Sequence, residues 1–315
     1  MTLNQLARTC PRVFDWGIRI DRAPAAAWLA LQAAALAPTW LWMARRLHDG
    51  ADDPLGLLAL GALAVFVVSM RRSLRAAPRL GWLALAAAGT LAATLLRTGI
   101  GPLPALPPLA AGLVAVLALG VGLLAFLPRG VARLPVLGLA VLALPLLSSL
   151  QFYAGYPLRV ITAEASRWLL APAFSVLREG SSLLVDGRLV IVDAPCSGVQ
   201  MAWLGYFTAC AVALWAQHGD RHFLARLPAV SLLVLAGNVL RNCVLTGFDG
   251  AGHALAPWLH EAVGLAVLAL VCGAIAQWMA SGAQSRSRRT NQAPSAPTPT
   301  LPQRGREQVR RLGST

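Results

Sequence analysis

Apolar residues in this chain of 315 residues arrive in runs of about 17 to 24, and this pattern limits the possible folds more than any other feature. An α-helix rises about 1.5 Å per residue, so about 20 residues cross a hydrocarbon layer about 30 Å thick. Hydrophobic residues make up 57% of the chain and charged residues only 13%, a composition rare in soluble proteins. The sequence therefore predicts an all-α, polytopic membrane protein.

Eight membrane-spanning helices are predicted from these runs. They lie near residues 23–43, 54–70, 80–97, 103–126, 134–152, 196–216, 227–247 and 260–280. The first five form an N-terminal bundle (23–152), and the last three, with the outer segment before them, form a second part (153–280). Residues 1–22 lack the apolar core of a cleavable signal peptide. The tail over 281–315, rich in Pro, Ser, Thr, Gln and Arg, is predicted to be disordered.

The distribution of arginine predicts the orientation in the membrane. Short loops rich in basic residues stay on the cytoplasmic side. Three such loops carry Arg71, Arg72, Arg75 and Arg79; Arg129 and Arg133; and Arg221 and Arg226. Both termini are then cytoplasmic, and Asp52 and Asp53 face outward, although Arg45 and Arg46 fall on the outer side against the rule. Orientation accounts for the net charge of +14, so no nucleic acid partner is predicted.

The longest segment between spans, residues 151–195, is predicted to lie on the outer face. Residues 157–178 have apolar positions at helical spacing, which indicates a short amphipathic helix along the interface. Two apolar, partly β-branched runs then flank Asp186-Gly187, a dipeptide that favours a two-residue β-hairpin turn. This hairpin, before the sixth span, would lead directly to Cys196.

Cys196 lies in the sequence Ala-Pro-Cys-Ser-Gly at the outer end of the sixth span. A helix begins well at a proline, and its first turn leaves unpaired N–H groups that stabilise a thiolate. Ser197 and Gly198 would support such a site. The alternative is a small packing residue, and this interpretation is given to Cys10, Cys210, Cys243 and Cys272. The five cysteines show neither metal-ligand spacing nor a disulfide pattern.

Arg241 lies about two turns before the outer end of the seventh span. A guanidinium within a span costs about 2.5–3.5 kcal/mol on insertion scales, so it usually faces a polar interior and marks a functional site. Asn238, one turn earlier on the same face, favours this interpretation. The alternative is a side chain that reaches the outer headgroups.

His260 begins the eighth span on the outer side and is followed by Glu261 and, one turn on, by Gly264. A solvated histidine at the interface is the alternative, and His253 is a weaker candidate. A cysteine, an arginine and a histidine thus occupy the outer ends of three successive spans. Imidazole can take the thiol proton and later protonate a leaving amine. A guanidinium can stabilise an oxyanion or hold the substrate.

Together, Pro-Cys-Ser-Gly at a helix start, Asn-x-x-Arg in the next span and His-x-x-x-Gly in the one after resemble the exosortase/archaeosortase family, over roughly residues 150–275. The resemblance implies a cysteine protease or transpeptidase of the bacterial inner membrane, with its active site facing the periplasm. It also implies Cys196 as nucleophile, Arg241 as the essential arginine and His260 as the proton-transfer residue. The substrates would be exported proteins with C-terminal sorting signals of the PEP-CTERM type. Asp193 is assigned no role.

The acyl group would pass to water or to an amine on a surface glycan or lipid. No prosthetic group or metal is predicted, because phosphate-binding glycine loops and metal-ligand spacings are absent from the sequence. Two other classes of protein stay open. One is a transporter or channel that binds an anionic solute through Arg241 and His260. The other is a non-catalytic membrane factor for polysaccharide export.

Overall fold

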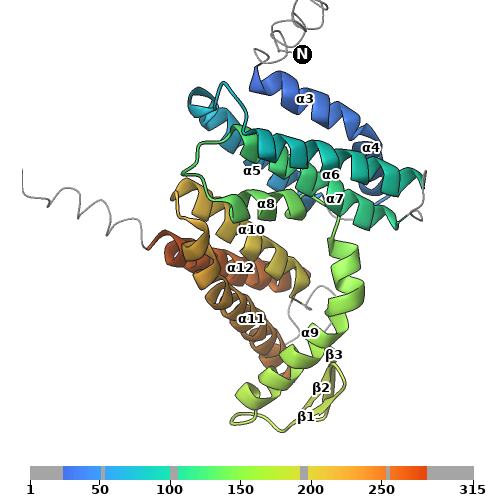
Figure 1. Cartoon of the computed structure of the whole chain (residues 1–315). Helices are drawn as coiled ribbons and strands as arrows, with labels where there is room; N and C mark the ends of the chain where they lie inside the picture. Colours follow the sequence, from blue (N-terminus) through green and yellow to red (C-terminus); the bar gives the residue numbers. More distant parts are fainter. Residues whose placement is uncertain (1–23, 51–53, 100–105, 192–197, 253–255, 282–315) are drawn as a thin grey trace, which may run out of the picture. The chain divides into compact units, whose positions relative to one another are not determined.

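The computed structural model describes residues 24–50, 54–99, 106–191, 198–252 and 256–281. Within these ranges the chain is mostly helical, with one small antiparallel sheet (Figure 1). The predictions for the N-terminus, for the tail after Ser281 and for seven single residues lie outside the described residues. These seven residues are Cys10, Asp52, Asp53, Asp193, Cys196, Ser197 and His253.

Apolar helices make up the first half of the fold. Their bounds are α3 (Ala25–Ala35), α4 (Ala37–His48), α5 (Leu55–Ser69), α6 (Leu80–Thr98) and α7 (Pro108–Phe126), with a 3-10 turn, η1 (Arg71–Ser73), between α5 and α6. The predicted span near 23–43 is interrupted at Leu36, and α4 begins with Pro38 in its first turn. Proline lacks the N–H that the interior of a helix uses for hydrogen bonding and is favoured in the first turn.

The predicted fifth span, 134–152, is also broken. Helix α8 (Arg133–Leu142) and helix α9 (Leu147–Leu170) meet at an angle of 95°. Pro145 lies in the short connection, where it can neither donate a backbone hydrogen bond nor fit over the preceding turn. Helix α9 therefore continues in a new direction and packs along α11 (Asp220–Gly250), which places residues of the segment predicted to lie outside the membrane beside the C-terminal helices (Figure 1).

A three-stranded sheet follows α9. Strands β1 (Val176–Glu179), β2 (Ser182–Val185) and β3 (Arg188–Ile191) pair in the order β1-β2-β3. Asp186 and Gly187 join β2 to β3 with positive φ angles of 47° and 80°, as a type I′ turn requires. The predicted helix over 157–178 is wrong at its C-terminal end, because α9 ends at Leu170, shortly before Pro172, and 176–179 join the sheet.

Contacts with two helices hold the sheet in place. Glu164 of α9 accepts hydrogen bonds from Arg167 Nη2 and from Arg178 Nε of β1, each at 2.6 Å. On the sheet's inner face, Leu183 and Val185 are buried in a cluster with Ala163 of α9. A β-carbon built on Gly250, the last residue of α11, would lie only 2.5 Å from Val185. The sheet therefore braces the ends of both α9 and α11.

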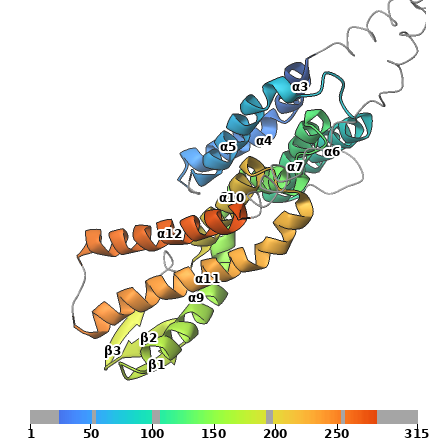
Figure 2. The same ribbon diagram turned by 90° about the vertical axis from the view of Figure 1, so that its left-hand side faces the viewer.

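The last three helices are α10 (Val199–Trp215), α11 and α12 (Pro257–Ala280), which pack against one another (Figure 2). Two glycines allow their close approach. A β-carbon on Gly205 of α10 would lie 2.5 Å from Val234 of α11, and one on Gly237 would lie 2.2 Å from Val271 of α12. Small residues at helix interfaces are the usual means by which membrane helices approach closely.

In the part of the chain that the structure describes, four helices are long and apolar enough to cross a membrane. These are α6, α7, α11 and α12, and the bent pair α8–α9 would make a fifth. Helices α3, α5 and α10 are apolar but shorter. The structure thus shows a mostly helical fold with four or five candidate spans, and the count of eight stays a prediction.

Candidate active site

Gly198 is the residue directly before α10, and the local geometry requires a glycine there. Its φ angle is +81°, in the left-handed region that side chains with a β-carbon disfavour. A β-carbon would also lie 2.7 Å from Cγ of Asn238 on α11. The glycine of Pro-Cys-Ser-Gly thus lets the start of α10 lie directly against the asparagine of Asn-x-x-Arg.

Asn238 is held by a hydrogen bond to α9. Its side chain is 3% exposed, and its Nδ2 donates to Oγ1 of Thr162 at 2.9 Å. One turn on, Nδ2 of Asn242 donates to Oγ of Ser166, again at 2.9 Å. Both pairs lie at i, i+4 spacing on their own helices, so they form two matched rungs between α9 and α11. We call these four residues the amide–hydroxyl ladder.

Arg241 lies between the two asparagines in sequence and contacts α12. A β-carbon on Gly264 would lie 3.1 Å from both Nε and Nη2 of Arg241, and 3.2 Å from its Cζ. The guanidinium therefore lies against the backbone of α12 at the glycine of His-x-x-x-Gly. The two glycine contacts, Gly198 with Asn238 and Arg241 with Gly264, bring the three sequence motifs together across α10, α11 and α12.

A cavity of about 280 Å³ opens at this meeting point. Arg241 of α11 and Gly198 both line it. The remaining lining comes from α10 and α12 and consists of Gln200, Met201, Leu204, Glu261, Gly264, Leu265 and Leu268. The cavity is thus mostly apolar, with a guanidinium, a carboxylate and an amide at its wall, a composition typical of sites that bind and orient a ligand.

His260, the predicted proton-transfer residue, lies in the first turn of α12 and is partly buried. It is one helical turn before Gly264, on the same face of the helix. The cavity wall at this level is formed by its neighbour Glu261. The predicted nucleophile Cys196 and its neighbour Ser197 lie outside the described residues, immediately before Gly198 in the sequence.

Sequence reasoning missed the residues that hold the motifs. Thr162 and Ser166 are fully buried, yet in the sequence they appear as ordinary small polar residues of an amphipathic segment. Their i, i+4 spacing matches that of Asn238 and Asn242, and this match was the available signal. Glu261 stands beside His260 in the sequence, but nothing in the pattern indicates that the carboxylate lines the cavity.

A comparison with protein-family models adds an independent finding. The model described as transmembrane exosortase matches residues 42–276, well over half of the chain. The chain belongs to the transmembrane exosortase family. The resemblance seen in the three motifs is thereby confirmed, and the match extends it toward the N-terminus as far as residue 42, within α4 of this exosortase. No curated protein and no solved structure matches it. Family membership and the apolar helices agree that this exosortase is a membrane protein.

Proposed function

We propose that this exosortase is a cysteine protease or transpeptidase that removes C-terminal sorting signals from exported proteins. One observation carries the proposal. The residues of three separate motifs converge on one cavity through the contacts of Gly198 with Asn238 and of Gly264 with Arg241. Only Ser197 separates Cys196 from Gly198 along the chain, so covalent geometry keeps the Cα atoms of these two residues within about 7 Å.

Each of the three side chains takes a defined step. The thiolate of Cys196 attacks the scissile carbonyl carbon after His260 has accepted the thiol proton. Arg241 stabilises the oxyanion of the tetrahedral intermediate. When the C–N bond breaks, His260 protonates the departing amine, and a thioester of Cys196 remains. Water or an amine then attacks the thioester carbonyl, and the thiolate leaves. Hydrolysis and transpeptidation share every step but this last one.

The distribution of charge along α11 supports a periplasmic site. Arg221 and Arg226 lie at the start of this 31-residue helix, and Arg241 lies in its final third. Because basic loops stay in the cytoplasm, the start of α11 faces inward and the cavity lies toward the outer side. The substrate would be an exported protein whose signal, of the PEP-CTERM type, has a short motif, a membrane helix and a basic cluster. Its helix would enter from the lipid beside α10, α11 and α12.

The test measures processing of a co-expressed protein that carries such a signal. Processing is detected as a change in the gel mobility of that protein. Cys196→Ala is expected to abolish processing, while the variant still inserts in the membrane at normal abundance. Cys272→Ala is the matched control, because Cys272 lies on α12 among residues that do not line the cavity. Normal processing by Cys196→Ala would refute the proposal and favour a transporter or a non-catalytic assembly factor.

Thiol labelling provides a second test that needs no substrate. A membrane-impermeant maleimide added to the periplasm should label Cys196, and the rate should fall in His260→Ala because the imidazole promotes thiolate formation. A Cys196 that is inert, or whose labelling rate is the same with and without His260, would contradict the assigned pairing.

A further inference from the structure

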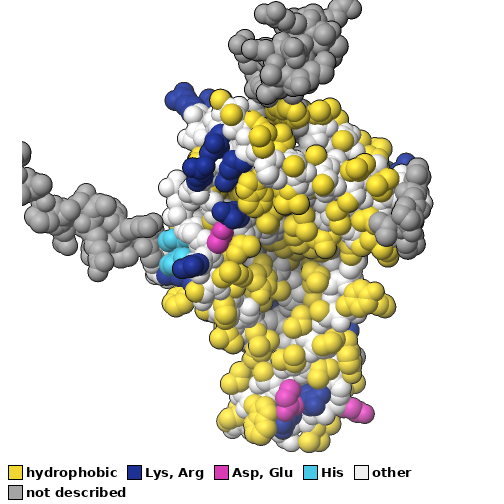
Figure 3. All heavy atoms as spheres, viewed as in Figure 1, with side chains coloured by type: hydrophobic (Ala, Val, Ile, Leu, Met, Phe, Trp, Pro, Cys, Tyr) yellow, Lys and Arg dark blue, Asp and Glu magenta, His cyan; other side chains and the backbone are white. Residues whose placement is uncertain are grey.

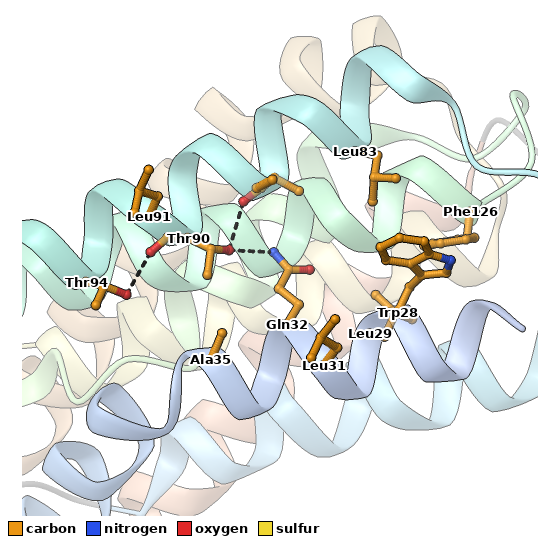
Figure 4. A pocket seen from close by; sticks show the side chains of 12 residues that line it. Trp28, Leu29, Leu31, Gln32, Ala35, Leu83, Thr90, Leu91, Thr94 and Phe126 are labelled. Carbon is orange, nitrogen blue, oxygen red and sulfur yellow. Dashed lines mark hydrogen bonds between the residues drawn. The ribbon is translucent and has the colours of Figure 1, made fainter. Parts of the chain in front are cut away.

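A second cavity lies between α3 and α6, away from the three motifs. Its volume is about 350 Å³. The residues that line it come mainly from these two helices, with Phe126 from the end of α7; they are Trp28, Leu29, Leu31, Gln32, Ala35, Leu83, Ala86, Ala87, Thr90, Leu91, Thr94 and Phe126. Figure 4 shows Trp28, Leu83 and Phe126 at one end of this α3–α6 groove and Thr94 and Ala35 at the other.

One polar side chain that lines the groove, Gln32, is hydrogen-bonded to two neighbouring helices. Nε2 of Gln32 donates to Oγ1 of Thr90 at 3.1 Å (Figure 4) and also to the carbonyl oxygen of Ala118 at 2.8 Å. These bonds join α3, α6 and α7. Nε2 of Gln32 and the hydroxyls of Thr90 and Thr94 are therefore bonded within the protein, and most of the lining is hydrocarbon.

The groove opens onto the apolar surface of the molecule. Leu31 and Leu91, one from each helix, line it and are 65% and 61% exposed. In a membrane protein such a surface faces lipid. The cavity volume is in the range of about 300–1,000 Å³ typical of small-ligand sites. A membrane helix, in contrast, packs along its length at an axis separation of about 8–10 Å and does not enter such a hollow. An acyl chain fits the groove better than a helix does.

One end of the groove adjoins a cluster of arginines. Arg79 lies one turn before the lining residue Leu83 and donates to the carbonyl oxygens of Leu124 and Leu127, on either side of Phe126. Backbone N–H of Arg75 donates to the carbonyl oxygen of Phe126 at 2.9 Å. Arg79 is therefore one turn from a residue that lines the groove, and the backbone of Arg75 is hydrogen-bonded to another.

The charge of this cluster is strongly positive. Arg79 and Arg133 both lie over the ring of Trp82, at 5.9 Å and 5.3 Å from its centre. Burial, and then the charges of Arg75, Arg133 and Arg129, lower the pKa of Arg79. One carboxylate is close: Asp220 accepts the backbone N–H groups of Arg133 and Leu134. Figure 3 shows basic side chains gathered on this side of the molecule, over the ends of α5, α6 and α8.

We propose that the α3–α6 groove binds one acyl chain of an anionic phospholipid, whose phosphate is held by Arg75, Arg79 and Arg133. The apolar groove and the arginines at its end match the two parts of such a lipid, because the acyl chain lies in the membrane interior and the phosphate lies at the membrane surface. The site is separate from the three motifs, so this lipid binding does not depend on the proposed peptidase activity.

The test is native mass spectrometry of the purified full-length protein, stripped of lipid and then titrated with dioleoyl phosphatidylglycerol or with dioleoyl phosphatidylcholine. The two lipids have the same chains and differ in headgroup charge. We expect one tightly retained phosphatidylglycerol and weaker retention of phosphatidylcholine. Ala87→Phe should abolish this retention by filling the groove. The matched control is Ala88→Phe, because Ala88 is the next exposed residue of α6 and does not line the groove.

A second pair of variants tests the headgroup contact. Arg133→Gln should lower the affinity for phosphatidylglycerol about fivefold, the size expected for one basic residue at an anionic lipid surface, and leave phosphatidylcholine unaffected. Arg45→Gln, an equal change of charge on α4, should have no such effect. Equal retention by Ala87→Phe and Ala88→Phe, or equal affinity for the two lipids, would overturn the proposal. So would loss of self-association in Ala87→Phe without loss of lipid, which would assign the groove to a second copy of the chain.

Discussion

Replacing Gly198 with alanine tests the contact that joins the first two motifs. A residue with a β-carbon at φ +81° costs roughly 1–2 kcal/mol. The new β-carbon would also lie 2.7 Å from Cγ of Asn238, whose amide is hydrogen-bonded to Thr162 and cannot move freely. Overpacking of this kind costs about 1–3 kcal/mol. Gly198→Ala should therefore destabilise the fold by about 2–5 kcal/mol.

A double-mutant cycle separates the two causes. In an Asn238→Ala background the clash is absent, so only the backbone cost of about 1–2 kcal/mol remains for Gly198→Ala. The two substitutions should thus be coupled by about 1–3 kcal/mol, with the double variant more stable than the sum of the single effects predicts. Unfolding of the purified protein in mixed detergent micelles, followed by tryptophan fluorescence, measures each free energy.

Gly273→Ala is the matched control. This glycine lies within α12, and a β-carbon there would meet nothing within 4 Å. Alanine should leave the free energy of unfolding unchanged or raise it by up to about 1 kcal/mol, because alanine favours the helix. If Gly198→Ala is as stable as Gly273→Ala, or if the coupling with Asn238→Ala is zero, the reasoning that places the start of α10 against Asn238 is wrong.

Three further predictions concern the same region and the opposite end of α11. Gly264→Ala should lower the rate of substrate processing about tenfold or more with little effect on the free energy of unfolding, because the new β-carbon would lie 3.1 Å from Nε of Arg241 and displace the guanidinium. An unchanged processing rate in vesicles would contradict this. Thr162→Val should destabilise the fold by about 0.6–1.7 kcal/mol, because the hydrogen bond from Asn238 is lost. The same unfolding assay measures this change with Thr98→Val as control, and equal free energies of unfolding for the two variants would count against the ladder. Burial lowers the pKa of His218, so as the pH falls the imidazole is protonated in the unfolded chain before it is protonated in the folded protein, and the free energy of unfolding should decline below the ordinary histidine pKa of about 6.5. His218→Phe should flatten this decline, and an unchanged pH profile would exclude His218 as its source.

The sequence located the polar residues that matter because they are out of place. Arg241 and Asn238 interrupt an otherwise apolar span, and such residues in a membrane helix are few enough to be noticed singly. The motif glycines could be identified in the sequence, but the structural reason for a glycine at each position could not. Only the structure shows that Gly198 lies against Asn238 and that Gly264 lies against Arg241, because both contacts depend on how neighbouring helices pack.

The parts of the fold that could not be predicted depend on where helices break. A hydropathy average depends on the composition of a window and not on the direction of the helix axis. Residues 134–152 were therefore predicted as one span, although α8 and α9 meet at 95°. The same limitation joined α3 to α4 across Leu36. Strand β1 was read as helix because the apolar spacing of 157–178 does not reveal that Val176 and Leu177 pair with Val185 and Leu184.

Energetics indicate why these polar residues stand where α9, α10, α11 and α12 meet. A guanidinium within a span costs about 2.5–3.5 kcal/mol, whereas a hydrogen bond between membrane helices contributes on average about 0.6 kcal/mol. The two bonds of the ladder therefore offset less than half of the cost of Arg241. The ladder also fixes the face of α11 that carries Arg241 and so directs the guanidinium to the cavity. A fixed orientation of this kind is what a preorganised charge-stabilising site requires and what a lipid-facing helix does not.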